Sequence, residues 1–199
     1  MAAPLFRWLY TLEARRDAST GRLLQAGAIP WCRRAGGRIE ILLITSRGSG
    51  KWIIPRGWSS RFRSLAQSAK REALEEAGVR GFISREPLGF VDAPKSYRLA
   101  GEINWLLAVH AMEVTDVLNS WKEAGQRQRQ WFPAEEAAGL VRPAALGPLM
   151  LELAAAKQRQ AGSRDEERSA GLLMSAPPEI AEPERRERRH SHANLGGAR

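Results

Sequence analysis

The sequence has one cysteine, three histidines and no long apolar run among its 199 residues. Because one thiol cannot form an intrachain disulfide, Cys32 indicates a reducing compartment, and we expect a cytoplasmic protein. So few cysteines and histidines do not indicate a zinc site. No apolar stretch approaches the roughly 18 residues of a membrane span. The N-terminus lacks a positively charged leader and a cleavage site, so we expect no signal peptide.

Basic charge is abundant and unevenly distributed. The formal net charge is +9, yet residues 162–199 carry seven Arg and seven Asp or Glu, so the whole excess lies in residues 1–161. A basic body attracts anionic ligands. Nucleic acid would satisfy the same charge, but the sequence lacks the interleaved aromatic and basic residues of an RNA-binding module. This favours a small polyphosphate as the partner.

Three glutamates are grouped at the centre of a predicted helix, in the segment Arg71–Val79 (REALEEAGV). With a turn angle of about 100° per residue, Glu72, Glu75 and Glu76 lie on one side of the helix. Like charges at this spacing repel by a few tenths of a kcal/mol per pair. An all-oxygen ligand set suits a hard cation such as Mg²⁺, with Mn²⁺ as an alternative. The plain alternative is a solvated acidic face.

The spacing of a glycine ahead of the glutamates favours the metal site over the solvated acidic face. Gly57 precedes Arg71 by fourteen residues, which gives the pattern G-x13-R-E-A-x-E-E-x-G-V. This resembles the Nudix box, G-x5-E-x7-R-E-U-x-E-E-x-G-U, where U is an aliphatic residue. The second half matches throughout, with Ala73 as a small U residue. One position departs, because the early Glu of the box is Arg63 here.

Two further stretches are similar to a subgroup of that family. Lys51–Trp58 (KWIIPRGW) resembles the W-x-x-P-K-G-W entry of a bacterial branch that also lacks the early Glu. Residues 114–137, which include Trp121, resemble the closing strand and helix of diphosphoinositol polyphosphate phosphohydrolases. The resemblance covers about residues 22–158. It implies an α/β fold, namely a Nudix-type α/β/α sandwich with a mixed β-sheet.

The resemblance also implies a chemistry, Mg²⁺-dependent hydrolysis of a phosphoanhydride in a nucleoside diphosphate-linked or polyphosphate substrate. Glu72 and Glu76 would bind Mg²⁺ or Mn²⁺, and Gly57 would offer its carbonyl to the same ion. Glu75 would be a metal ligand or the general base. Arg71 would hold a glutamate in place through a bidentate pair.

Positively charged side chains are needed to stabilise the leaving phosphate. The sequence offers eight candidates: Arg22, Arg47, Arg56, Arg61, Arg63, Lys95, Arg98 and Arg129. We expect Arg47, Arg56, Arg98 and Arg129 to bind substrate. Of these, Arg47, Arg98 and Arg129 lie near positions that bind phosphates in diphosphoinositol-type enzymes. Gln25 replaces a basic residue there, which weakens the case for a heavily phosphorylated inositol.

The pattern of apolar residues predicts the elements around this site. Ser64 with Gln67 forms a capping box that starts the glutamate helix, and Gly78 ends it. A second helix starts at Pro133. Strands are expected over Gln25–Arg34, Arg38–Ser46, Lys51–Ile54, Gly81–Val91, Glu102–Val114 and Arg127–Phe132, and a terminal helix over Pro143–Arg159.

The chain divides by composition into three parts. Residues 1–20 are an N-terminal arm, residues 21–160 the Nudix hydrolase domain, and residues 161–199 a mixed-charge tail that we predict to be disordered. The sequence does not indicate an oligomeric state, and we expect no membrane partner.

Two other functions remain open at this stage. The chain would fit an RNA 5′-pyrophosphohydrolase, in which the only nucleic acid bound is an RNA 5′ end. It would also fit a non-catalytic polyphosphate-binding module in which Arg63 marks lost catalysis. A decaying site usually loses its carboxylates first, and all three are retained here, which favours an enzyme.

Overall fold

The computed structural model describes residues 15–92, 95–97, 101–103 and 105–174. The chain forms two compact units, which divide after Ser163. The elements in chain order are β1 (Leu23–Arg33), η1 (Ala35–Gly37), β2 (Ile39–Thr45), β3 (Trp52–Ile53), β4 (Arg56–Trp58), α2 (Leu65–Ala77), β5 (Val79–Ile83), β6 (Gly89–Asp92), β7 (Lys95–Tyr97), β8 (Gly101–Ile103), β9 (Trp105–Val117), β10 (Arg129–Pro133), α3 (Ala134–Leu140) and α4 (Leu146–Met174).

A mixed sheet forms the centre of the first unit. Its strands follow the order β10-β2-β1-β9-β5, with β3 beside β2, β4 beside β1 and β6 beside β9. The central pair β1–β9 is parallel, and the other pairings in this sheet are antiparallel. The long apolar strands β1 and β9 are buried on both faces, as central strands of a covered sheet should be. The expected mixed sheet is therefore confirmed.

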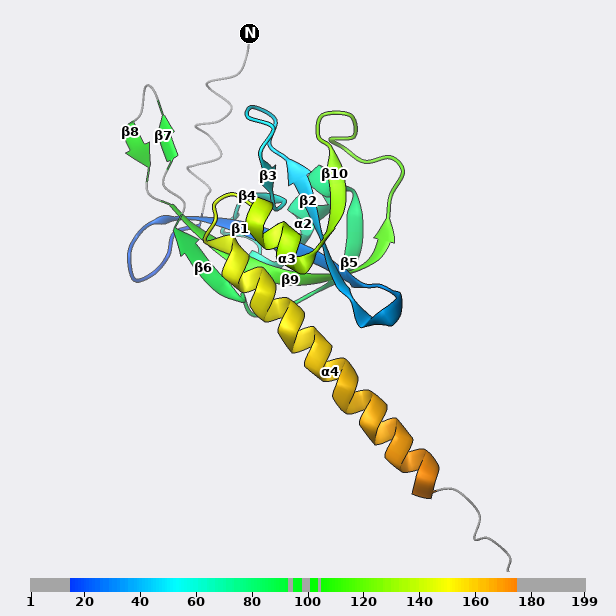
Figure 1. Cartoon of the computed structure of the whole chain (residues 1–199). Coiled ribbons are helices and arrows are strands. Elements are labelled where there is room, and N and C mark those ends of the chain that lie inside the picture. The colour runs from blue at the N-terminus through cyan, green and yellow to red at the C-terminus, as the bar shows by residue number, and fades with distance from the viewer. Residues whose placement is uncertain (1–14, 93–94, 98–100, 104, 175–199) are drawn as a thin grey trace, which may run out of the picture. The chain divides into compact units, whose positions relative to one another are not determined.

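Helices cover both faces of this sheet, with α3 in front and α2 behind in Figure 1. Because successive side chains of a strand point to opposite faces, β1 and β9 contribute to two separate cores. One core packs against α3 and the first turns of α4, and includes Leu107, Val109, Leu146 and Met150. The other packs against α2. Its members include Ala26, Ala28, Ala69, Ala73, Ala77 and Met112. The expected α/β/α sandwich is confirmed.

Helix α2 starts and ends as its sequence predicts. The Ser64 side chain accepts a hydrogen bond from the Gln67 backbone N–H, and the Gln67 side chain accepts one from the Ser64 N–H, which completes the capping box. Gly78 ends the helix with φ +62°, a left-handed conformation that favours glycine. A Cβ there would overlap the ring of Trp121. The helix is therefore fixed at both ends.

The predicted strand over Gly81–Val91 is two strands, β5 and β6, which pair with different parts of β9. Between them, the Ser84 hydroxyl accepts a hydrogen bond from the Ala111 N–H, and the His110 ring bonds to the Ser84 carbonyl. Pro87 lies in the same interval and has no N–H to donate to a ladder. The interruption is therefore local, and His110 is a buried sheet residue rather than a site residue.

The terminal helix is longer than the predicted Pro143–Arg159, because α4 continues to Met174 and so enters the segment predicted to be disordered. Residues 161–174 include Arg, Glu, Ala, Leu and Met, which are good helix formers, and extending an existing helix costs far less than nucleating one. Few apolar side chains are needed for such an extension. The remainder of the predicted tail, and most of the predicted N-terminal arm, lie outside the described residues.

Candidate active site

The three glutamates lie on the flank of α2, beside the face that packs on the sheet. The small side chains of Ala69, Ala73 and Ala77 are fully buried and let the helix approach the sheet closely. Glu72 and Glu76 are next to this stripe and are only 9% and 7% exposed. Glu75 is turned further out and is partly exposed. The helix therefore presents two buried carboxylates and one accessible carboxylate.

The backbone of β4 lies directly against the two buried carboxylates. The Arg56 N–H donates to Glu76 Oε2 at 3.0 Å. A Cβ at Gly57 would overlap the carboxylate of Glu72, so any other residue at this position would displace that carboxylate. The fourteen-residue spacing in the sequence therefore corresponds to a contact between the strand and the helix. Gly57 lies beside the glutamates, as expected of a residue that shares their ligand.

Each of the three carboxylates is paired with a cation. Arg71 donates through one nitrogen to Glu72 Oε1 at 2.7 Å, and Lys122 Nζ donates to Glu75 at 2.7 Å. Arg127 pairs with Glu76. In the part of the chain that the structure describes, no three His, Cys, Asp or Glu side chains converge as metal ligands. The donor chemistry nevertheless suits Mg²⁺ or Mn²⁺, because adjacent buried carboxylates need cationic compensation. A metal would have to draw these side chains away from their present partners.

Burial changes the protonation of the two inner carboxylates. Desolvation raises the pKa of Glu72, although Arg71 opposes the change. Desolvation also raises the pKa of Glu76 to about 7, against the hydrogen bond from Arg56 and the charge of Arg127. Arg127 is shared between Glu76 and Glu123, so one positive charge faces two carboxylates. Both carboxylates are thus held in an environment that favours an added positive charge.

The raised pKa of Glu76 predicts how the metal-free protein responds to pH. Ionising a group whose pKa is higher in the folded state destabilises the fold, so stability falls as pH rises from about 4.5 to about 7. At about 1.4 kcal/mol per pKa unit, the loss is of the order of a few kcal/mol. In EDTA, the unfolding free energy of the native protein should decrease more between pH 5 and pH 8 than that of Glu76→Gln. Equal slopes would contradict the assignment.

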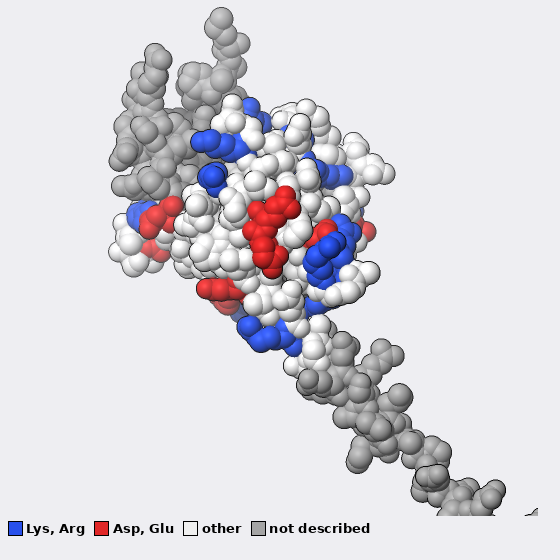
Figure 2. Space-filling view, viewed as in Figure 1, with Lys and Arg blue, Asp and Glu red and all other residues white. Residues whose placement is uncertain are grey.

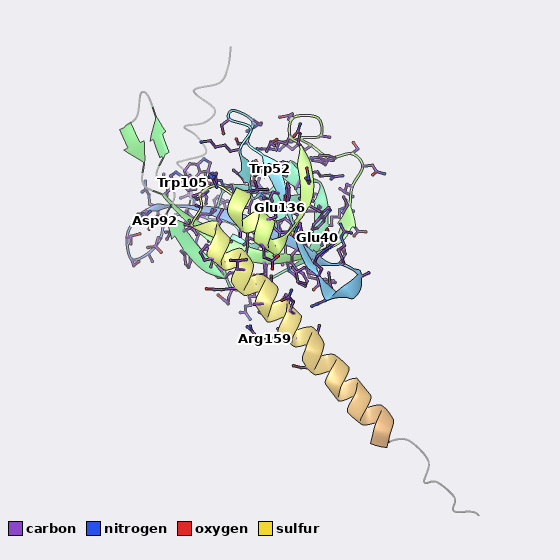
Figure 3. All side chains as sticks on the ribbon, viewed as in Figure 1. Glu40, Trp52, Asp92, Trp105, Glu136 and Arg159 are labelled. Carbon is purple, nitrogen blue, oxygen red and sulfur yellow. The ribbon has the colours of Figure 1, made fainter. Side chains whose placement is uncertain are left out.

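The predicted substrate arginines lie in different surroundings. Arg56 packs over the ring of Trp105, with its guanidinium carbon 5.1 Å from the ring centre, and its own N–H already bonds to Glu76. Trp105 lies beside Asp92 at one end of the sheet (Figure 3). Arg47 is 59% exposed and lies 3.4 Å from a Glu123 oxygen. Arg98 lies outside the described residues. Arg56 thus lies against a glutamate of α2 and Arg47 against Glu123, and the substrate role of both stays a prediction.

Arg129 has a different environment from the one expected. Its guanidinium donates to the carbonyls of Ala77 and Leu118 at 2.8 and 2.7 Å, and stacks on Trp121 at 4.0 Å. These carbonyls include the unpaired end of α2, which a cation stabilises. The contacts make Arg129 a cap of the helix, and the substrate role predicted for it stays without a supporting contact.

The cap predicts a stability effect at this position. Arg129→Met should lower the unfolding free energy by about 1.5–3 kcal/mol, because it leaves partly buried carbonyls without a donor. The Mn²⁺ affinity should fall far less than in Glu76→Gln, since Arg129 donates to the carbonyls of Ala77 and Leu118. The matched control is Arg80→Met, which removes the same charge from an exposed residue of β5. An unchanged melting temperature with a raised KM would instead support a substrate contact.

Sequence reasoning missed the residues between β9 and β10. Residues 118–128, called here the β9–β10 loop, include no predicted site residue, yet the loop supplies Trp121, Lys122, Glu123 and Arg127 to the site. The available signal was the run Trp-Lys-Glu with an arginine four residues after the glutamate. Arg63, by contrast, is exposed ahead of α2.

Among the described helices, none is both long enough and apolar enough to cross a membrane.

Comparisons with known proteins agree with the fold and with the motif. The NUDIX domain family matches residues 22–153. Nudix hydrolase 12, mitochondrial, from Arabidopsis thaliana is 32% identical over 108 residues, which cover 53% of each chain. Diphosphoinositol polyphosphate phosphohydrolase 2 from Homo sapiens is 31% identical over 109 residues, 53% of this chain and 56% of the relative. The chain thus spans about half the length of these curated relatives.

A solved structure supports the fold alone. The Ap4A hydrolase of C. elegans superimposes with a TM-score of 0.50 at 21% sequence identity, and the match covers 67% of this chain and 97% of that one.

Proposed function

The chain belongs to the NUDIX domain family, and from that premise we propose that it is a Mg²⁺-dependent pyrophosphohydrolase that cleaves a phosphoanhydride by attack of water at phosphorus. The observation that carries the proposal is the contact of β4 with α2, which places Gly57 against Glu72 and the Arg56 N–H on Glu76. It joins the two halves of the motif into one site. The site also retains all three carboxylates.

The buried carboxylates of Glu72 and Glu76 would hold the metal, together with the carbonyl of Gly57. When bound, Mg²⁺ neutralises phosphate oxygens and lowers the pKa of water. Glu72 and Glu76 suit this role because burial leaves them in need of a cation. Their fixed positions on a capped helix would keep both carboxylates oriented toward the metal.

Glu75 is the residue that suits proton transfer. It is the most exposed of the three carboxylates, and its partner Lys122 is itself 67% exposed, so the pair opens readily to solvent. Glu75 would take a proton from the attacking water as the water oxygen bonds to phosphorus. The anhydride P–O bond breaks, and the leaving phosphate keeps the electron pair. Arg47 and Arg56 would stabilise the developing charge.

The substrate class that we propose is a dinucleoside polyphosphate or a diphosphoinositol polyphosphate. The similarity to a diphosphoinositol polyphosphate phosphohydrolase supports this class, as does the basic body of the chain. Gln25 occupies β1 next to Trp58 on β4, where the diphosphoinositol-type enzymes have a basic residue. Fewer positive charges favour the dinucleoside polyphosphate within this class.

The test is a screen of the purified full chain with Mg²⁺ or with EDTA. Substrates are diadenosine tetraphosphate, a diphosphoinositol polyphosphate, ADP-ribose and a 5′-triphosphorylated oligoribonucleotide. We expect Mg²⁺-dependent release of phosphate-containing products, fastest with one of the first two. Fastest turnover of the oligoribonucleotide would replace this substrate class with an RNA 5′ end. Tight binding without turnover at any metal concentration would overturn catalysis and leave a binding module.

A further inference from the structure

The β9–β10 loop is fastened along the C-terminal half of α2. The Glu123 N–H donates to the Glu75 carbonyl at 3.1 Å, and the Leu118 N–H donates to the Gly78 carbonyl at 2.8 Å. The indole N–H of Trp121 donates to the Glu76 carbonyl at 3.2 Å. Backbone groups of the helix that carries the metal glutamates are thus bonded to the loop. Side chains of the loop are held at a fixed place relative to these carboxylates.

Two of these side chains form a buried ion pair beside Glu76. The Arg127 side chain is only 5% exposed, and its guanidinium bonds to Glu76, to Glu123 Oε2 at 2.7 Å and to the Thr45 carbonyl at 3.0 Å. One cation therefore bridges two carboxylates. The planar fork of arginine can do this because its N–H groups point in fixed, separate directions. Lysine, with a single charged nitrogen, cannot reproduce the bridge.

Charge is unevenly compensated at this end of the site. Glu123 has 15% of its side chain exposed, and its other oxygen lies 3.4 Å from the largely exposed Arg47. An exposed arginine is screened by water and compensates little. Glu123 also lies near enough to raise the pKa of both Glu72 and Glu76 through its charge. Arg127 thus serves one buried and one partly buried acid, and the negative charge of Glu123 acts on the two inner glutamates of α2.

We propose that Glu123 is a positioning residue of the metal site. It draws one side of the Arg127 guanidinium to itself, which orients Arg127 so that Glu76 is held but not neutralised. Its own charge adds to the field that attracts a divalent cation. The inference rests on the proposed function, because it assigns Glu123 a role toward the metal that Glu72 and Glu76 would bind. It extends the site beyond α2 to a loop far away in the sequence.

The test is the affinity for Mn²⁺ alone, measured by titration calorimetry on the full-length protein without substrate. Glu123→Gln keeps the shape of the side chain and removes its charge. We expect the Kd for Mn²⁺ to rise about tenfold, the lower end of the range for residues that orient metal ligands. The matched control is Glu136→Gln on α3, an exposed acid on the other face of the sheet (Figure 3). It removes the same charge and should leave the Kd unchanged.

A second pair of variants separates positioning from folding. Glu123→Asp keeps the charge and should recover part of the affinity. Arg127→Lys keeps the charge but loses the fork, and should also weaken Mn²⁺ binding. Circular dichroism establishes that each variant is folded. A lower melting temperature with a native Kd in Glu123→Gln and Arg127→Lys would show a merely structural role and overturn the inference.

The failure of this inference is distinguishable from that of the proposed function. If Glu76→Gln abolishes Mn²⁺ binding and Glu123→Gln leaves it native, the positioning role fails and the metal site stands. If the native protein binds no Mn²⁺, the metal site itself fails, and the role of Glu123 fails with it.

Discussion

Glu76→Gln is expected to lower the kcat of Mg²⁺-dependent hydrolysis by more than about 100-fold, the upper end of the cost of losing a partner of a metal ligand. The substitution keeps the volume of the side chain and its bond to the Arg56 N–H. It removes the negative charge that the metal needs, from a residue of which only 7% is exposed. Glu75→Gln should also abolish most turnover, because general-base catalysis contributes about 10²–10⁴-fold. The measurement is the initial rate on the best substrate of the screen.

The control for both variants is Glu136→Gln. An acidic patch covers α3 in Figure 2, and the first turn of that helix carries Glu135 and Glu136. Because this face is turned away from α2, loss of one of its charges should leave kcat within about twofold, in line with the small effect of exposed charges. Retained turnover in both Glu75→Gln and Glu76→Gln would overturn the assignment of the site.

Gly57→Ala is expected to disturb both the fold and the proposed metal site. Its methyl group would occupy the space of the Glu72 carboxylate, and the buried helix flank leaves little room for that carboxylate to move. Overpacking of this kind costs about 1–3 kcal/mol. The displaced Glu72 would also lose its alignment with Glu76. We therefore expect both a lower melting temperature and a loss of Mn²⁺ affinity.

Gly139→Ala in α3 is a matched control for this prediction. A Cβ at Gly139 meets nothing within 4 Å. Alanine in a helix is favoured over glycine by about 0.5–1 kcal/mol, so this variant should be as stable as the native protein or slightly more stable. If Gly57→Ala behaves in the same way and keeps native Mn²⁺ affinity, the contact between β4 and α2 does not shape the site.

Much of α2 could be predicted from the sequence because its determinants are local. Ser64 and Gln67 are three residues apart and cap the helix by themselves, and Gly78 supplies the left-handed residue that ends it. The spacing of Glu72 and Glu76 places them on one flank in any regular helix. The fold followed from the resemblance, since alternating apolar strands alone do not specify the order of a mixed sheet.

The contacts of the β9–β10 loop could not be predicted in this way. Arg127 pairs with Glu76, which is 51 residues away in the sequence. Arg129 donates to the carbonyl of Ala77 at the end of α2, 52 residues away. Nothing in the residues near Arg129 distinguishes an arginine that binds phosphate from one that binds carbonyls. The distinction arises only when Trp121 packs on the end of α2 and fixes the guanidinium over its ring.

The length of α4 was misjudged for a different reason. Composition indicated disorder from residue 161, because that segment has few large apolar residues. A helix that already packs through Leu146 and Met150 can be extended by charged helix formers without a core of its own. Composition indicates whether an isolated segment can fold. The segment after residue 161 is not isolated, because it continues a helix whose first turns are packed in the core.

The most direct test of the account is the rate of hydrolysis of diadenosine tetraphosphate, or of the better substrate from the screen, as a function of Mg²⁺ concentration. The account predicts no turnover in EDTA, a saturable rise with Mg²⁺, and recovery when Mg²⁺ is restored to the chelated protein. The same titration on Glu76→Gln should stay flat over this range. Equal turnover with Mg²⁺ and with EDTA would contradict a metal site at Glu72, Glu75 and Glu76.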